Sequence, residues 1–171
     1  ISDHLLCQLM ICRTFYNSPI GLIEICGTEN SVTSLYFIDE EFNPDVKSNP
    51  YIEKCVEQLD EYFNGKRKIF ELNLKAEGTD FQKRVWDELI KIPYGETRSY
   101  MEITKLLGDP KAIRAVANAN GQNKISIIIP CHRVIGSDGS LIGYGGGLWR
   151  KKWLLDHEQK FSDNEKQLEF T

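Results

Sequence analysis

The chain has 171 residues, a length that makes one large domain or two small ones. Its hydrophobic fraction of 41% is enough to build a core, and it has no run of about 18 apolar residues, which excludes a membrane-spanning helix. The five cysteines form no CxxC pair, and their odd number indicates free thiols in a reducing compartment. We therefore expect an intracellular protein without a secretory leader.

The net charge of −4 by itself argues against binding to nucleic acid, but the charge is unevenly distributed. Residues 79–160 hold 13 Lys/Arg and 9 Asp/Glu, whereas the rest of the chain holds 8 Lys/Arg and 16 Asp/Glu. An acidic N-terminal part joined to a basic C-terminal part is typical of a modest polyanion binder. Chance variation between two surfaces explains the numbers equally well, so charge leaves both interpretations open.

The first part of the chain reads as strands followed by a helix. Three short runs have the composition of β-strands and are separated by turn sequences: 9–16, 20–26 and 32–37. A helix is predicted from Pro50 to a C-terminal cap at Gly65, because four apolar residues recur at helical spacing: Ile52, Val56, Leu59 and Phe63. A further strand is predicted over residues 69–74.

The second part contains clear helix-start signals. Thr79 and Gln82 form a capping box, in which each side chain bonds to the other residue's backbone amide. Ser99 and Glu102 form a second capping box, and the helix that follows is expected to stop at Gly108. We predict four segments: an α/β domain over 1–74, a linker over 75–78, a mainly helical domain over 79–160 and a frayed polar tail over 161–171.

A helix-turn-helix is predicted where the second and third helices of this part meet. Asp109 caps a helix that begins at Pro110 and runs to residue 119, directly after the short helix that ends at Gly108. This third helix would be the recognition helix, and its small residues would let the backbone approach a duplex closely: Ala112, Ala115, Ala117 and Ala119. Such a corner with close helix packing also occurs in proteins that bind no DNA.

The most reactive residues follow this helix. An apolar run over 125–129 predicts a strand that ends at Pro130, and Cys131 comes next on a stiff turn. The adjacent His132 can raise the thiolate population, directly or through a water. Free cysteines are mostly buried and inert, however, so the pair alone does not decide between catalysis and packing.

The last helix is predicted to begin at Leu148, after a glycine-rich loop over 143–147 whose amides can approach a ligand. Its packing residues would be Trp149, Trp153 and Leu154, and its solvent-facing residues would be Arg150, Lys151 and Lys152. Glu158 closes the helix, where it either orients His132 in a Cys-His-Glu relay or is a surface carboxylate.

Five separated stretches resemble one family of repair proteins. They are Gly-Thr-Asp-Phe-Gln at 78–82, Ile-Pro-Tyr-Gly-Glu-Thr at 92–97, Arg-Ala-Val at 114–116, Ile-Pro-Cys-His-Arg-Val at 129–134 and Trp-Leu-Leu-Asp-His-Glu at 153–158. Residues 78–158 thereby resemble the C-terminal domain of the O6-alkylguanine-DNA alkyltransferases, also called methylated-DNA–protein-cysteine methyltransferases. A shorter stretch, Ser-Pro-Ile-Gly at 18–21, extends the match to the first part. The implied fold is a ribonuclease-H-like α/β domain, with a small antiparallel sheet plus a helix, followed by a mainly α winged helix-turn-helix domain.

The resemblance implies a single-turnover DNA repair enzyme without a cofactor. It would bind double-stranded DNA through the minor groove as a monomer and flip the damaged nucleotide out of the stack. It would then transfer the alkyl group of O6-alkylguanine, and of O4-alkylthymine, irreversibly to its own Cys131. Its compartment would be the cytoplasm in a prokaryote and the nucleus in a eukaryote.

The resemblance also assigns a role to individual residues. Arg114 would fill the space left by the flipped base, and Tyr100 would press on the target phosphate and donate a hydrogen bond to guanine N3. Asn123 would tie the recognition helix to the active-site turn, while Glu158 orients His132 as a general base acting through water. The base pocket would be lined by Tyr144, Gly145, Val134 and Gly146, and the groove contacts would come from Ala112, Ala115 and Ala117.

Three questions remain open at this level. Some relatives hold a structural zinc, but this chain has Leu9, Thr28 and Thr33 at the alignable ligand positions, so we expect no metal although Cys7 and Cys26 lie nearby. A non-catalytic lesion-binding module is a second functional hypothesis, and the presence of Cys131 argues against it. A cysteine hydrolase or acyltransferase for small molecules is a third, and it leaves the helix-turn-helix and Arg114 unexplained.

Overall fold

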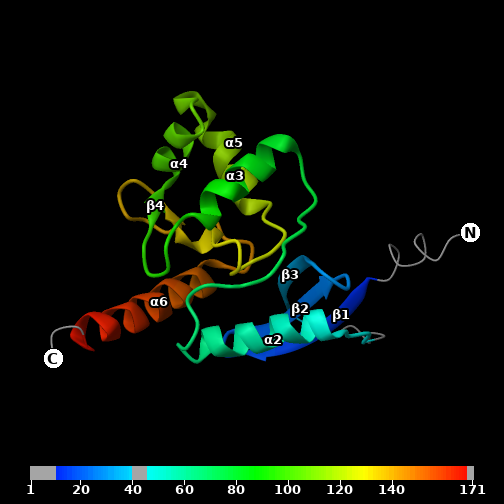
Figure 1. Cartoon of the computed structure of the whole chain (residues 1–171). Helices are drawn as coiled ribbons and strands as arrows, with labels where there is room; N and C mark the ends of the chain where they lie inside the picture. The colour runs from blue at the N-terminus through cyan, green and yellow to red at the C-terminus, as the bar shows by residue number, and fades with distance from the viewer. Residues whose placement is uncertain (1–10, 40–45, 169–171) are drawn as a thin grey trace, which may run out of the picture. The chain divides into compact units, whose positions relative to one another are not determined.

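The computed structural model describes residues 11–39 and 46–168, with side chains up to Ser162, and divides into two compact units, Ile1–Glu77 and Gly78–Thr171 (Figure 1). Each unit is described by itself. The start of the predicted strand 9–16, together with Cys7 and Leu9, lies outside the described residues. Among the residues that are described, no helix is long and apolar enough to cross a membrane.

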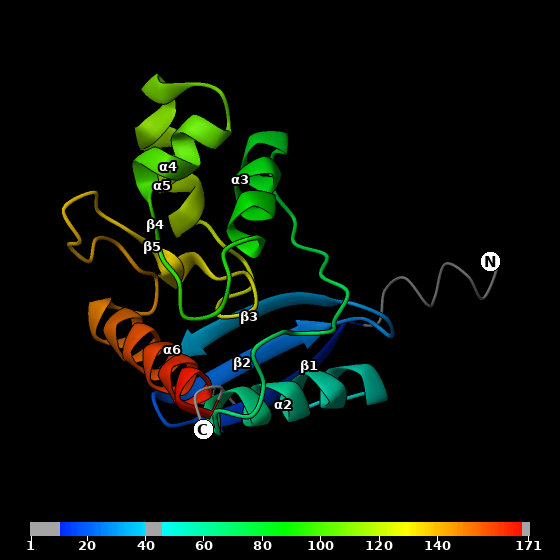
Figure 2. The ribbon, with the colours of Figure 1, turned by 60° about the vertical axis from the view of Figure 1, so that its left-hand side comes forward.

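The first unit is a three-stranded antiparallel sheet with one helix along it (Figures 1 and 2). The strands are β1 (Cys12–Ser18), β2 (Gly21–Gly27) and β3 (Val32–Ile38), in the order β1-β2-β3. Helix α2 (Pro50–Phe63) begins at the N-cap Asn49, whose side chain accepts from the Ile52 amide. The core of the unit is formed by buried apolar side chains, among them Ile23, Ile25, Leu35, Ile52 and Leu59.

The prediction of a strand over residues 69–74 is wrong. Only Leu74 forms an isolated bridge, to Val32, and the rest of the segment is irregular. Side chains take the place of a ladder partner, because Gln58 bonds to both the amide and the carbonyl of Glu71, and Arg67 donates to the Ile69 carbonyl at 2.8 Å. A strand-like composition cannot reveal that side chains will satisfy the backbone groups.

The second unit begins with helices α3 (Asp80–Ile90) and α4 (Tyr100–Leu106), and both predicted capping boxes are present. A 3-10 turn, η1 (Pro110–Ala112), precedes helix α5 (Ile113–Gly121), so the predicted recognition helix is split at its start. Helix α3 packs on α5, and Trp86 Nε1 donates to the Ala119 carbonyl at 2.9 Å. Short strands β4 (Arg98–Ser99) and β5 (Val134–Ile135) pair in parallel. A small antiparallel sheet with a helix, followed by a mainly helical unit, confirms the predicted fold class.

The apolar run over residues 125–129 is a series of tight turns and not the predicted strand. The Ile128 amide donates to the Ser126 carbonyl at 2.8 Å, and the Ile129 amide donates to the Ile125 carbonyl at 3.0 Å. Ile127 has a φ of 72°, a conformation that a β-branched residue rarely adopts. The four isoleucines of the segment are buried in these turns, and burial alone cannot distinguish a turn from a strand.

The last helix, α6 (Leu148–Leu168), is longer than predicted. It continues past Glu158 through residues 161–168, so the prediction of a frayed tail is wrong for that segment and Glu158 lies inside the helix. One face continues beyond residue 158: the ring of Trp153 stacks on His157, and His157 meets Phe161 edge to face, each pair with ring centroids 4.9 Å apart. The polar composition of the tail concealed this row of ring contacts.

Candidate active site

Cys131 opens a 3-10 turn, η2 (Cys131–Arg133), that follows Pro130. The Cys131 amide donates to the Ile129 carbonyl at 2.8 Å, and the Arg133 amide donates to the Pro130 carbonyl at 3.0 Å. The residue is only 4% exposed. The thiol is therefore carried on a short hydrogen-bonded turn and is almost fully buried.

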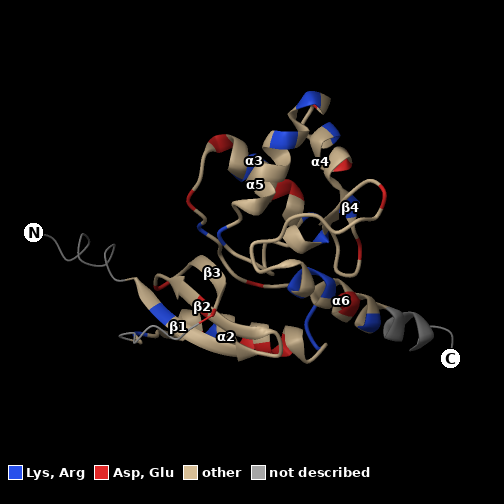
Figure 3. Cartoon of the chain, turned by 180° about the vertical axis from the view of Figure 1, so that it is seen from behind, with Lys and Arg blue, Asp and Glu red and all other residues tan. Residues whose placement is uncertain are grey.

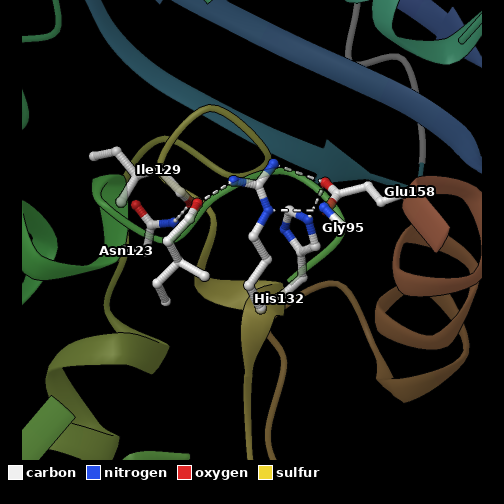
Figure 4. A network of polar contacts seen from close by, with 7 residues as sticks. Gly95, Asn123, Ile129, His132 and Glu158 are labelled. Carbon is white, nitrogen blue, oxygen red and sulfur yellow. Dashed lines mark hydrogen bonds and ion pairs between the residues drawn. The ribbon is translucent and has the colours of Figure 1, made fainter. Parts of the chain in front are cut away.

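Asn123 forms hydrogen bonds to the segment that precedes this turn, and Figure 4 shows its bond to Ile129. Its Nδ2 donates to the Ile129 carbonyl at 2.8 Å and to the Ile125 carbonyl at 3.4 Å, while its Oδ1 accepts from the Ile125 amide at 3.0 Å. Because Asn123 comes two residues after the end of α5, these bonds connect that helix to the cysteine turn. The Asn123 side chain is buried, and its tying role in the reaction stays a prediction.

His132 and Glu158 meet in the buried interior of the second unit (Figure 4). The imidazole Nε2 lies 2.7 Å from Glu158 Oε1, and Glu158 Oε2 accepts from the Gly95 amide at 3.1 Å. The other imidazole nitrogen, Nδ1, is buried and has no hydrogen-bond partner among the described residues. When Nε2 carries the proton that the carboxylate accepts, Nδ1 has a free lone pair and can act as a base.

Arg133 is a second partner of Glu158 that the sequence reasoning missed. Its Nε and Nη2 each lie 2.9 Å from a different carboxylate oxygen, and its Nη1 donates to the Ile92 carbonyl at 2.6 Å. Such a bidentate contact fixes the carboxylate plane. The signal was present in the sequence, because an Arg directly after the Cys-His pair can place its charge beside the same carboxylate.

The pKa values of His132 and Glu158 are both lowered, but burial is the cause for His132 and neighbouring charges are the cause for Glu158. Burial lowers the pKa of His132 despite the favourable charge of Glu158, so the imidazole is neutral near neutral pH. Burial alone would raise the pKa of Glu158, but the charges and hydrogen bonds of His132 and Arg133 outweigh it and lower the pKa well below its usual range. The site therefore combines a neutral imidazole with a fixed carboxylate.

Lys151 was predicted to lie in solvent, and this prediction is wrong. Lys151 is 0% exposed, and its Nζ donates to the carbonyls of Val134 at 2.6 Å, Ile142 at 2.9 Å and Gly143 at 3.4 Å. Those carbonyls belong to β5 and to the loop before α6, and each turns its oxygen toward the start of the helix. A lysine between two other basic residues on a helix gives no sequence signal of burial.

The Lys151 ammonium also acts on the thiol. Burial raises the pKa of Cys131, whereas the hydrogen bond of Asn123 and the charge of Lys151 oppose that effect. Burial in turn lowers the pKa of Lys151 to about 8. The resting nucleophile is thus a protonated thiol beside a cation that favours its ionised form.

A pocket of about 330 Å³ opens beside the site, within the size range of small-ligand pockets. It is lined by residues from α4, α5 and the loop before α6: Tyr100, Ile113, Arg114, Ala117, Gly121, Ile142, Gly143 and Tyr144. The charge of Cys131 raises the pKa of both tyrosines after the larger effect of their burial, which places the thiol within electrostatic range of the pocket. Arg114 is exposed at this pocket.

The structure brings together only part of the predicted groove and pocket residues. Ala117 lines the pocket, whereas Ala112 and Ala115 lie on α5 and its preceding turn outside it. Val134 is buried in β5 and contributes its carbonyl to Lys151. Gly145 and Gly146 belong to the loop without lining the pocket, and a Cβ added at Gly145 would meet no heavy atom within 4 Å.

The positions that align with the zinc ligands of some relatives, where no metal was expected, are only partly described. The Thr28 hydroxyl lies 2.7 Å from the Ser31 hydroxyl, and Leu9 is outside the described residues. Among the side chains that are described, within 11–39 and 46–162, no group of three or more His, Cys, Asp or Glu could hold a metal ion. In the second unit, Lys and Arg residues occur on α3, α4 and the turn before α5 (Figure 3).

Comparison with known proteins identifies the family. Residues 80–160 match the family described as "6-O-methylguanine DNA methyltransferase, DNA binding domain", and residues 11–76 match "6-O-methylguanine DNA methyltransferase, ribonuclease-like domain". The chain belongs to the methylated-DNA–protein-cysteine methyltransferases. This confirms the resemblance seen in the sequence.

The matched relatives are similar over almost their whole length. A methylated-DNA–protein-cysteine methyltransferase of Mycobacterium leprae is 48% identical over 152 residues, which cover 86% of this chain and 92% of the relative. One of Methanosarcina barkeri is 48% identical over 147 residues, covering 83% and 93%. The crystal structure of the Mycobacterium tuberculosis O6-methylguanine methyltransferase matches with a TM-score of 0.80 at 45% identity, covering 88% and 94%. A structure of that protein in complex with DNA matches with a TM-score of 0.79 at 46% identity, covering 86% and 92%.

Proposed function

We propose that this methyltransferase-family chain repairs O6-alkylguanine in DNA, and O4-alkylthymine as a second substrate, by taking the alkyl group onto the Cys131 sulfur. One observation carries the proposal: a buried thiol next to His132, whose Nδ1 has no partner among the described residues, beside a pocket lined by the helix-turn-helix. The family membership supports alkyl transfer, and the DNA complex of the Mycobacterium tuberculosis protein supports DNA as the partner.

The proposed reaction is a displacement at the alkyl carbon. The Cys131 thiol passes its proton through a water to Nδ1 of His132, which Glu158 orients through Nε2. A bond forms between the sulfur and the alkyl carbon as the bond between that carbon and guanine O6 breaks. The electron pair of the broken bond remains on the guanine, which leaves as a neutral base once protonated.

The product explains a single turnover. A thioether is a poor leaving group, so the alkyl group is expected to stay on the Cys131 sulfur. We expect one chain to be consumed for each lesion, with no cofactor in the reaction. A hydrolase or acyltransferase with the same Cys-His-Glu set would instead release product repeatedly.

The proposed substrate is a flipped nucleotide in the minor groove of duplex DNA, bound by a monomer. Arg114, exposed at the pocket, would fill the space in the stack, and the small side chain of Ala117 would let the groove approach the helix. Extruding a base costs a few kcal/mol, and a damaged pair lowers that cost. The Tyr100 hydroxyl, which donates to the Ile142 carbonyl at 2.9 Å, would turn to guanine N3.

The direct test is the mass of the cysteine peptides after reaction. The chain is incubated with duplex DNA containing O6-methylguanine and digested with trypsin. We expect one methyl group per chain on the peptide that contains Cys131 and none on the peptides with the buried Cys12 or Cys55. The proposal fails if the Cys131 peptide remains unmethylated or if one chain demethylates many lesions.

Base extrusion has its own test. Arg114→Ala should slow methyl transfer from duplex DNA by about tenfold or more, because a few kcal/mol of extrusion cost is no longer offset. The same variant should react with a single-stranded oligonucleotide at close to the wild-type rate, since no stacked partner strand must be replaced. Equal slowing on both substrates would contradict the assigned role of Arg114.

A further inference from the structure

Arg133 is a buried charge that the proposed reaction does not yet use. It is 6% exposed and directly follows His132 on η2. Its Nε lies 2.9 Å from Glu158 Oε2 and its Nη2 lies 2.9 Å from Oε1, so one guanidinium contacts both carboxylate oxygens. Its Nη1 donates to the Ile92 carbonyl at 2.6 Å, and its Cζ lies 5.7 Å from the centroid of the Tyr94 ring. The loop before β4 therefore holds the guanidinium beside the carboxylate.

The carboxylate of Glu158 needs a counter-charge because it is buried. Glu158 and His132 are both 0% exposed, and His132 Nε2 lies 2.7 Å from Glu158 Oε1. A buried carboxylate is stable when a neighbouring cation neutralises it. Among the described partners of Glu158, Arg133 is permanently charged, whereas His132 becomes a cation only by taking up a second proton. With Arg133 in place, the carboxylate is neutralised and the imidazole can stay uncharged.

Stability alone does not explain this ion pair. Replacing a buried ion pair by apolar side chains of similar volume is often neutral or stabilising. The pair does, however, act on the imidazole beside it. His132 Nε2 and Arg133 Nη2 both contact the same oxygen of Glu158, so the charge of the guanidinium disfavours a positive charge on the imidazole.

Lys151 is a second cation that faces the imidazole. Its Nζ is bonded to backbone carbonyls of β5 and of the loop before α6. Burial has the largest effect on the pKa of His132 and lowers it, and the charge of Glu158 raises it. The charges of Arg133 and Lys151 lower it further. Of these two cations, Arg133 is the one bonded to the carboxylate, so its loss would leave Glu158 to be neutralised by the imidazole.

We propose that Arg133 is a positioning residue: it neutralises Glu158, so that His132 stays an uncharged base for the thiol proton. This inference rests on the proposed alkyl transfer. In that reaction the thiol proton passes through a water to Nδ1 of His132, which becomes an imidazolium, while Glu158 stays ionised throughout. Without Arg133, the imidazole would already be protonated as the counter-charge of Glu158, and the thiol proton would have no acceptor at Nδ1.

The first test removes the charge and then restores it. The imidazole nitrogens of His132 are followed by NMR as the pH is changed, without DNA. We expect Arg133→Met to raise the pH at which His132 titrates by about one pH unit or more. Arg133→Lys keeps the counter-charge and should titrate close to the wild type. The double variant Arg133→Met with Glu158→Gln lacks both charges, so its His132 should titrate no higher than in the wild type.

The second test measures methyl transfer from duplex DNA containing O6-methylguanine, in single turnover at saturating DNA and over a range of pH. The rate should fall on the acidic side as His132 becomes charged. For Arg133→Met this fall should occur about one pH unit higher, which makes the variant about tenfold slower at acidic pH. Arg133→Lys should keep the wild-type profile. The matched control is Arg13→Met, at an exposed arginine of the first unit that pairs with Glu24 at 3.5 Å, and it should change neither rate nor profile.

These measurements separate the proposed role from a purely structural one. A guanidinium that serves only packing would change the midpoint of urea unfolding without changing the pH at which His132 titrates. If the wild-type chain transfers methyl groups and Arg133→Met titrates as the wild type does, the role of Arg133 alone is overturned. A raised titration that Arg133→Lys does not restore overturns it as well. Arg133→Gln provides a second uncharged variant if the methionine side chain prevents folding. A wild-type chain that transfers no methyl group overturns the proposed function and this inference together.

Discussion

At the scale of single residues, the site depends on how buried charges are arranged around one thiol. Glu158 is shared between His132 and Arg133, and Lys151 is held by three carbonyls near Cys131. A buried charge is stable only when it is paired and hydrogen-bonded, so each of these groups depends on its neighbours. Substituting one of these buried charged residues should therefore change reactivity or stability more than substituting an exposed residue of the same type.

Lys151→Met should weaken the nucleophile. Removing the ammonium raises the pKa of Cys131, because that charge lowers it in the wild type. The charge is present below the Lys151 pKa of about 8, so the loss is largest at neutral pH. We expect iodoacetamide alkylation of Cys131 to require a higher pH by about one unit. Lys152→Met, at an exposed lysine paired with Asp156, should leave the profile unchanged; equal shifts in both variants would contradict this role.

Glu158→Gln should destabilise the fold by about 3–5 kcal/mol, since it leaves the buried guanidinium of Arg133 without its counter-charge. The pKa of Glu158 is lowered in the folded chain, so its stabilising effect is present above about pH 4.3 and is lost as the pH falls further. Urea unfolding at pH 7 measures the difference. The exposed change Asp156→Asn should cost less than about 0.5 kcal/mol, and a similar cost for both would refute the argument.

At the scale of secondary-structure elements, the second unit uses helix caps and tight turns to present its side chains. Capping boxes start α3 and α4, and the turns after Asn123 carry Cys131. Gly95 illustrates the packing of these connections. It has a φ of 77°, and an added Cβ would lie 2.1 Å from the Ser162 hydroxyl, while its amide donates to Glu158. Ser162, in the part of α6 beyond Glu158, thus lies against the loop whose Gly95 amide binds the Glu158 carboxylate.

Thr79→Ala should separate stability from reactivity. The Thr79 hydroxyl accepts from the Gln82 amide at 3.1 Å at the start of α3, far in the chain from the cysteine turn. Loss of an N-cap costs about 1 kcal/mol, which urea unfolding detects. The rate of methyl transfer per folded chain should stay at the wild-type value. A transfer rate that falls with the same variant would show that the helix start contributes to the site.

At the scale of the whole molecule, charge is divided between the two units. The chain carries a net charge of −4, yet residues 79–160 have an excess of Lys and Arg. The proposed DNA contacts therefore come from a locally basic unit of an acidic protein. Binding through phosphates should be strongly salt-dependent, because counterions are released from the DNA.

Lys111→Gln should lower the salt dependence of DNA binding. Lys111 is exposed in the turn before the recognition helix. If it contacts a phosphate, the slope of log K against log salt should decrease by about one, with the same change on every sequence. Fluorescence anisotropy with a labelled duplex at several salt concentrations measures this slope. Lys91→Gln should leave the slope unchanged. Lys91 is an exposed lysine that pairs with Glu88 at the C-terminal end of α3.

Local signals were read well from the sequence because they depend on residues close together in the chain. The capping boxes at Thr79 and Ser99 need only a spacing of three residues, and both are present. The stretch around Cys131 was specific enough to indicate the family, which the comparisons confirm. The meeting of His132 with Glu158 was expected from the resemblance and could not be derived from local spacing.

Only the tertiary structure decided which polar groups are buried and what they contact. Lys151 and Arg133 look like surface residues in a basic sequence, yet both lie inside because carbonyls and a carboxylate from distant segments accept hydrogen bonds from them. The sequence shows which residues are apolar or charged. The hydrogen-bond or ion-pair partner of a buried charged residue comes from chain segments that meet only when the unit is folded.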